Sequence, residues 1–210
     1  GTMFYLLAYG FSTLGAFART DPSFATPNVE YHVQPLSLGR FGDPLHAFPA
    51  ITASVCNLRP TSRGAVRLKS TDPAAAPAIA PNYLATDEDR RVAADAIRLT
   101  RTIMAAEALA PHRPREHLPG ADVTSEAELV SAAGALGTTI FHPVSTVRMG
   151  GDVAAPLDGR MRLRGVPGLR VVDASVMPTI TSGNTNAPTI MIAEKGADMI
   201  LADARAQSAA

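Results

Sequence analysis

The chain has 210 residues and a mass of 21.9 kDa, which suit one large domain or two small ones. Its residues are 46% hydrophobic and 18% charged, and 19 basic side chains balance 19 acidic ones, so a core can form but the basic surface typical of nucleic-acid-binding proteins is missing. A single cysteine excludes an internal disulfide and any four-cysteine zinc site. We predict a soluble, cytoplasmic protein that binds no nucleic acid.

The first apolar stretch, Met3 to Ala18, is a candidate for a signal or a membrane span. Its first basic residue, Arg19, follows the apolar stretch, whereas a secretory signal has its basic residues in front. The stretch is also short for a membrane span and is interrupted by Gly10 and Gly15. We therefore predict a loop and a buried segment, with no membrane partner, and leave the role of residues 1–20 open.

The first third of the chain is rich in strand-forming residues. Val29–Leu38 and Ala50–Leu58 carry β-branched and aromatic side chains between Pro and Gly residues, and Gly64–Lys69 alternates small or apolar residues with basic ones. These three stretches predict strands. The proline-rich stretch Asp72–Pro81 predicts an extended connector.

Two helices follow, each with a capping-box pattern at its start. Thr86 and Asp89 begin the first helix, and Ser125 and Glu128 begin the second, which Gly137 should end. Each helix has a predicted buried stripe at steps of three and four. These stripes are Val92, Ala96, Leu99 and Ile103 in the first helix and Leu129, Ala132, Ala133 and Leu136 in the second.

A last helix is predicted from about Asn186, because Pro188 then falls in the first turn, where a missing N–H costs nothing. Its predicted buried stripe is Ile190, Ala193, Ala197 and Ile200. Strands, then helices, then a short strand and a terminal helix indicate an α+β fold.

A candidate chemical site begins in residues 139–150. His142 follows the aromatic Phe141 and precedes Pro143, which favours extended backbone at the histidine. Taken alone, a lone histidine in an apolar segment is more often structural than catalytic.

The other candidate segment is residues 168–189. Leu169–Val172 predicts a buried strand, with Asp173 at the carboxyl end that faces the ligand crevice in α/β sheets. Residues 183–186 (Gly-Asn-Thr-Asn) then lead into a helix amino terminus, whose free N–H groups favour electron-rich atoms. Each asparagine also fits an ordinary turn or helix cap.

Together, these two segments resemble the carboxy-terminal signature of the glucose–methanol–choline (GMC) oxidoreductases. Residues 171–200, VVDASVMPTITSGNTNAPTIMIAEKGADMI, carry most of the resemblance and are long enough to be specific. The stretches VEYHVQP (29–35), ASVCNLRPTSRG (53–64) and APNY (80–83) resemble the choline-dehydrogenase-like branch in order and spacing. The resemblance implies FAD as cofactor and oxidation of a primary alcohol to an aldehyde.

The resemblance also implies a domain plan. Residues 21–140 would form a substrate-binding domain with a mostly antiparallel sheet and flanking helices. Residues 141–210 would supply the catalytic strand and the carboxy-terminal part of the FAD-binding domain, including its last strand and helix. The small-molecule alcohol would bind where these parts meet the amino-terminal FAD-binding portion.

Site roles follow from the resemblance position by position. His142 corresponds to the catalytic base, and Asn184 to the second active-site position, whose amide would donate to the substrate oxygen. Phe141 would line the substrate pocket, although an ordinary core aromatic is an equal alternative. The cofactor-binding positions are Asp173, Ala174, Thr185, Asn186 and Ala187. The base would take the hydroxyl proton while a hydride passes to flavin N5, and an imidazole, with an ordinary pKa near 6.5, suits that task.

The sequence departs from the family pattern in two places. Ser145 stands where the family has glycine, and we expect it to forbid an easy left-handed backbone there. The G-x-G-x-x-G run that holds the ADP half of the flavin does not occur. We therefore expect a carboxy-terminal fragment that binds FAD weakly or not at all by itself. The alternative is a non-catalytic remnant that acts as a binding or assembly module.

Other candidate sites are weaker. His112 and His117 are spaced like a metal pair, but no nearby carboxylate or cysteine completes a set, so we predict a solvated loop and no metal there. Cys56 lies in a predicted strand and is expected to be a buried structural thiol.

Overall fold

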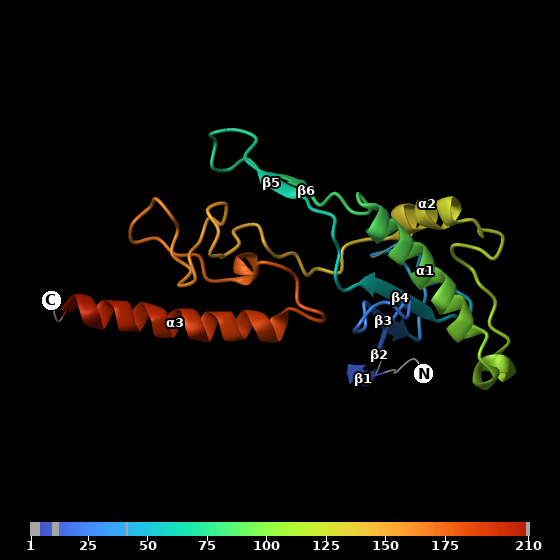
Figure 1. The fold of residues 1–210 in the computed structure, drawn as a ribbon. Coiled ribbons are helices and arrows are strands. Elements are labelled where there is room, and N and C mark those ends of the chain that lie inside the picture. The colour runs from blue at the N-terminus through green and yellow to red at the C-terminus, as the bar shows by residue number, and fades with distance from the viewer. Residues whose placement is uncertain (1–4, 10–12, 41, 209–210) are drawn as a thin grey trace. The chain divides into compact units, whose positions relative to one another are not determined.

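The computed structural model describes residues 5–9, 13–40 and 42–208, and the chain folds as two compact units. The first unit covers residues 1–140 and the second covers residues 141–210. The first unit contains the strands and two of the α-helices, and the second is built around one long helix (Figure 1). The mixed α and β content and the antiparallel sheets confirm the predicted α+β class.

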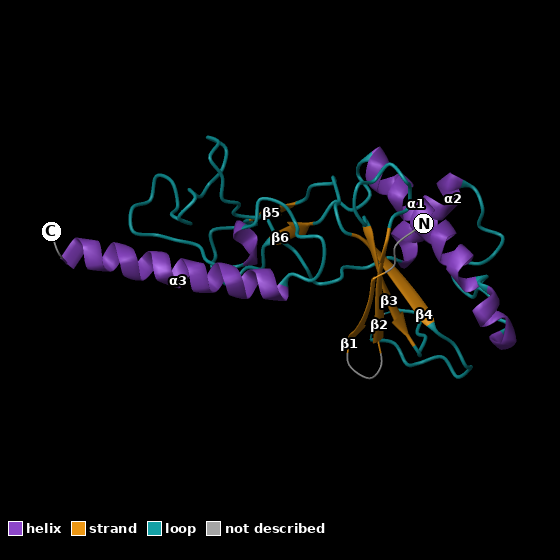
Figure 2. Ribbon diagram, turned by 60° about the horizontal axis from the view of Figure 1, so that its bottom comes forward, coloured by secondary structure: helices purple, strands orange, loops and turns teal. Residues whose placement is uncertain are grey.

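A four-stranded antiparallel sheet forms the centre of the first unit. Its strands β1 to β4 pair in chain order, as Figure 2 shows. They are Tyr5–Tyr9, Thr13–Ala18, Val29–Gln34 and Thr52–Asn57. The two predicted strands at 29–38 and 50–58 are confirmed with shorter bounds. The prediction of a loop before residue 19 is wrong where β1 and β2 lie. β1 pairs with β2 and β2 pairs with β3, and this pairing supplies the hydrogen bonds that local sequence does not reveal.

Helix α1 (Asp87–Met104) covers one face of this sheet. Val92 and Ala96 of the helix are buried against Val29 and Tyr31 of β3, and Leu99 and Ile103 pack around them, which confirms the predicted stripe. The Thr86 side chain caps the helix by accepting from the Asp89 N–H, as predicted.

The Asp89 side chain ties the start of α1 to the loop after β4. Its carboxylate is buried and accepts hydrogen bonds from the backbone N–H groups of Thr61 (2.9 Å) and Ser62 (2.8 Å). Burial alone would raise the pKa of Asp89, but these hydrogen bonds outweigh it and lower the pKa. The charged carboxylate therefore fixes the helix to the edge of the sheet.

The remaining elements of the first unit are short. Helix α2 (Glu126–Leu136) has the predicted capping box and ends at Gly137, but of its predicted stripe only Leu129 is fully buried. A 3₁₀-helix, η1, spans Glu107–His112. Strands β5 (Ala65–Arg67) and β6 (Ala78–Ala80) form a hairpin, so the predicted connector at 72–81 ends in a strand.

The second unit contains a short 3₁₀-helix, η2 (Ala174–Val176), and the long helix α3 (Asn186–Ser208). Its core gathers Leu157, Met161, Val176, Met177 and Ile192. The predicted strand at Leu169–Val172 is wrong: Leu169 is 48% exposed, and within the described residues the segment pairs only through a bridge between Arg170 and Arg162. Two backbone hydrogen bonds flank this bridge, from Leu163 N–H to Leu169 and from Val171 N–H to Met161, and they are too few to extend it into a strand.

The buried stripe of α3 also differs from the prediction. Ile192 and Gly196 are buried, whereas Ile190 and Ile200 are 55% and 45% exposed. The helix is apolar on more than one side, so periodicity alone does not select a face. Gly196 determines which face of the helix is buried, because only a residue without a side chain lets the helix approach Val172 this closely. None of the described helices is both long enough and apolar enough to cross a membrane.

We expect Gly196→Ala to destabilise the chain by roughly 1–3 kcal/mol, the usual cost of overpacking. A Cβ atom at position 196 would lie 2.5 Å from Val172 Cγ1 and 3.2 Å from Met161 Cε. Urea denaturation followed by circular dichroism measures the loss. Adding Val172→Ala should restore part of it, whereas a single Gly196→Ala variant as stable as the parent would contradict this packing.

Candidate active site

His142 lies in a loop whose backbone is held in an uncommon conformation on both sides. Phe141 has φ of 63° and Ser145 has φ of 71°, both in the left-handed region that side chains other than glycine rarely occupy. The expectation that Ser145 would avoid this region is therefore wrong. The loop keeps the turn that glycine would allow, at a conformational cost of roughly 1–2 kcal/mol.

Two side chains from the start of α3 hold the His142 ring. Thr185 Oγ1 lies 2.7 Å from His142 Nδ1, and Asn184 Nδ2 lies 3.2 Å from His142 Nε2. An amide nitrogen can only donate, so Nε2 accepts and carries the lone pair, and Nδ1 then carries the proton and donates it to Thr185. In this tautomer the nitrogen with the lone pair, Nε2, faces Asn184.

Thr185 is itself held by the first turn of α3. It is 7% exposed, and its carbonyl accepts from the N–H of Thr189 at 3.0 Å and from the hydroxyl of Thr189 at 2.7 Å. The hydroxyl that contacts His142 is therefore fixed to a rigid element. The helix start, more than forty residues away in sequence, orients the imidazole.

The same helix start offers backbone donors. The first backbone bond of α3 runs from Thr189 to Thr185, so the N–H groups of Asn186 and Ala187 precede the helical hydrogen-bond ladder. Close in sequence, the buried hydroxyl of Thr181 makes no hydrogen bond within the described residues. These groups fit a ligand edge rich in oxygen and nitrogen acceptors.

The other predicted site residues lie around η2 and the His142 loop. Asp173 is exposed and caps η2 by accepting from the Ser175 N–H at 2.7 Å, and Ala174 begins that helix and packs against the core of this unit. Phe141 is 63% exposed in this chain. Asn186 and Ala187 are exposed at the surface of the first helical turn.

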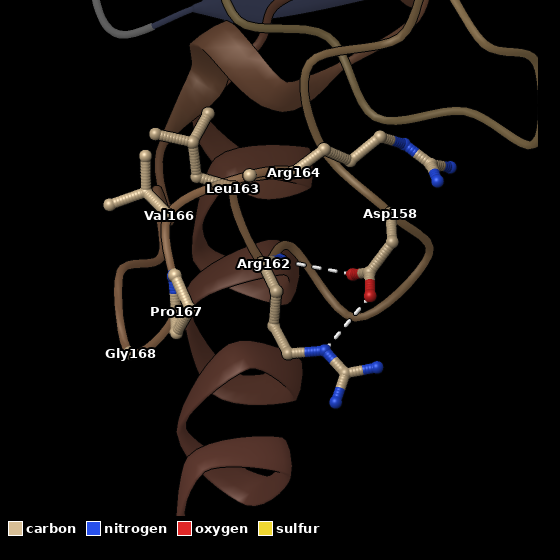
Figure 3. Close-up of a pocket in the computed structure, with 8 residues that line it drawn as sticks. Asp158, Arg162, Leu163, Arg164, Val166, Pro167 and Gly168 are labelled. Atoms are coloured by element: carbon tan, nitrogen blue, oxygen red, sulfur yellow. Dashed lines mark hydrogen bonds and ion pairs between the residues drawn. The ribbon is translucent and has the colours of Figure 1, made fainter.

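A separate hollow of about 320 Å³ lies in the loop from Asp158 to Gly168 (Figure 3). The Asp158 carboxylate accepts from the backbone N–H of Arg162 at 3.0 Å and from its Nε at 2.8 Å. The backbone hydrogen bond and this pairing lower the pKa of Asp158 to about 2. The third charged lining residue, Arg164, donates to the carbonyl oxygens of Ala155 and Gly150, and none of the site residues named above lines the hollow.

The structure thus places the His142 imidazole between the amide of Asn184 and the hydroxyl of Thr185, next to the start of α3. The family model described as GMC oxidoreductase matches residues 60–193. The chain belongs to this family, as the sequence resemblance indicates.

Individual relatives agree with this assignment. The chain is 48% identical over 189 residues to an oxygen-dependent choline dehydrogenase of Pseudomonas fluorescens, and 42% identical over 187 residues to an alcohol dehydrogenase [acceptor] of Pseudomonas putida. Each match covers 89% of this chain, and they cover 33% and 34% of the relatives. The chain thus spans about a third of the length of the curated relatives it matches.

Solved structures of related proteins also match this chain. Pyridoxine 4-oxidase from Mesorbium loti matches with a TM-score of 0.79 and 33% identity, over 89% of this chain and 37% of its own. A formate oxidase matches with a TM-score of 0.81 and 25% identity, over 90% of this chain and 38% of its own.

Proposed function

We propose that this chain is the carboxy-terminal part of an FAD-dependent enzyme that oxidises a primary alcohol to an aldehyde, with His142 as the base. The observation that carries the proposal is the pair of contacts on the His142 ring, which leaves the lone pair of Nε2 facing Asn184. Membership of the GMC oxidoreductase family supports the reaction class.

His142 and Asn184 have complementary tasks in this proposal. The alcohol loses a proton from its oxygen and a hydride from the adjacent carbon, and the Nε2 lone pair takes the proton. The amide of Asn184 then turns its N–H from Nε2 to the developing alkoxide, as an oxyanion-hole donor does. Because an amide does not compete for the proton, the two groups can share one substrate oxygen.

Thr185 has a supporting role. As the imidazole becomes positively charged, its Nδ1–H becomes a stronger donor, and the Thr185 hydroxyl at 2.7 Å is in place to accept from it. The hydroxyl also prevents the ring from rotating. Thr185 is therefore a positioning residue, and its side chain serves His142 instead of the cofactor.

When bound, FAD would accept the hydride at its N5 atom. The backbone N–H groups of Asn186 and Ala187, at the positive end of α3, would hold the edge of the flavin ring on which negative charge gathers. The Thr181 hydroxyl offers one more hydrogen-bonding group in the same segment. Asp173 and Ala174 would contact the ribityl and pyrophosphate region, and Phe141 would line the substrate pocket.

The amino-terminal two thirds of the P. fluorescens relative, joined to residues 13–208 of this chain, gives a direct test. We expect the purified chimera to retain FAD and a primary alcohol to bleach the flavin absorbance under anaerobic conditions, with formation of one aldehyde per flavin. The untreated chimera without alcohol is the control. A chimera that retains FAD but is reduced by none of a panel of choline, aryl and aliphatic alcohols would contradict the proposal and favour the non-catalytic alternative.

A further inference from the structure

The face of the sheet opposite α1 carries three metal-binding side chains at adjacent positions. Glu30 of β3 lies directly opposite Cys56 of β4, and His32 follows two residues later on the same side of β3. One ligand atom from each side chain lies within 4.8 Å of the other two. This cluster lies in the first unit and shares no residue with the candidate active site.

The cluster is largely withdrawn from solvent. The side chains of Glu30 and His32 are 3% and 17% exposed, and His32 Nε2 lies 3.6 Å from Glu30 Oε1, beyond hydrogen-bond distance. Within the described residues this buried nitrogen makes no hydrogen bond. Buried polar atoms nearly always have a partner, so the imidazole is aimed at a position that a ligand can fill.

We infer that Glu30, His32 and Cys56 form a binding site for a divalent cation of the zinc class. Zinc takes thiolate, imidazole and carboxylate ligands at about 2.0–2.3 Å, which sets tetrahedral donors roughly 3.5 Å apart. Small rotations of side chains already within 4.8 Å reach that spacing. Magnesium and calcium prefer oxygen ligands alone, so one sulfur and one nitrogen favour zinc or its analogue cobalt.

The charges of the three side chains also favour a divalent cation. A dipositive ion, one thiolate, one carboxylate and a neutral imidazole sum to zero, so such an ion would leave no net charge in this buried position. A coordinating cation stabilises the thiolate form that a cysteine ligand needs. The fourth position of the ion would be open to water or to a small ligand.

Cobalt titration of the purified, chelator-treated full chain tests the inference. We expect one Co²⁺ per chain and a thiolate-to-cobalt charge-transfer band in the near ultraviolet. Glu30→Gln, His32→Gln and Cys56→Ser should each weaken binding by more than about 100-fold. Loss of an outer-shell partner costs up to about that factor, and loss of a direct ligand should cost more. His46→Gln, which removes another imidazole of the same unit, is the matched control and should bind normally.

The unmodified chain provides a second test that does not depend on how the variants fold. Cys56 is its only cysteine, so its alkylation by a thiol reagent reports on this site alone. With Zn²⁺ at about 100 times its dissociation constant, alkylation should slow by about 100-fold and recover on addition of EDTA, because only the metal-free fraction reacts. An unchanged alkylation rate, or the lack of a charge-transfer band, would overturn the inference and leave a buried Glu30–His32 pair. Neither test requires flavin or an alcohol.

Discussion

His142→Ala in the flavin-loaded chimera is expected to lower kcat by about 10²–10⁴-fold, the contribution of a positioned base. The substitution removes the Nε2 lone pair that faces Asn184. Stopped-flow reduction of the flavin by alcohol measures the hydride step directly. The flavin should stay bound, because the residues proposed to hold it lie at the start of α3 and around η2.

The matched control for this variant is His112→Ala. His112 is an exposed histidine at the end of η1 and has no part in the candidate site, so its loss should leave the reduction rate unchanged. If His142→Ala reduced its flavin at a near-normal rate with FAD retained, another group would have to take the alcohol proton. The proposed role of His142 would then be withdrawn.

Local signals account for most of the helices that the sequence predicts. The N-cap Thr86 and the capping box of Ser125 mark the starts of α1 and α2, because a side-chain oxygen satisfies an otherwise unpaired N–H in each first turn. The stripe of α1 is also predicted, since its polar and apolar faces are well separated. These features depend only on residues a few positions apart.

Features that depend on distant partners are not predicted. Strand β2 forms because it pairs with β3, and nothing within Thr13–Ala18 indicates that pairing. The buried face of α3 is fixed by the close approach of Gly196 to Val172, which periodicity does not contain. Leu169–Val172 has the composition of a strand but only a single bridge to pair with.

In the candidate site, too, some features are predicted from the sequence and others are not. Family resemblance selects His142 and Asn184, and the structure brings their side chains within 3.2 Å, although their catalytic roles remain predictions. Thr185 is predicted to contact the cofactor through its backbone, and the structure adds a contact of its hydroxyl with His142. A side-chain direction at a helix start depends on how the helix docks, and no residue pattern in the sequence reports it. The cluster of Glu30, His32 and Cys56 is likewise not predicted from the sequence, because the register of β3 and β4 brings Cys56 next to the other two residues.

Thr185→Val in the chimera is expected to lower kcat by roughly 10–100-fold with little change in KM. Valine keeps the shape of threonine but cannot accept from His142 Nδ1, so the imidazolium formed during proton transfer loses its partner. A hydrogen bond to a charged group contributes about 1.5–3 kcal/mol, which corresponds to about that range in rate. Flavin reduction at saturating alcohol measures the effect.

Two further variants distinguish positioning from a purely structural role. Thr185→Ser keeps the hydroxyl and should recover most of the rate, even though it loses the methyl group that packs in this buried position. Thr179→Val removes an exposed hydroxyl from the same segment and should react like the parent. If Thr185→Ser were as slow as Thr185→Val, packing at the start of α3 would explain the loss, and the hydroxyl would not be what orients His142.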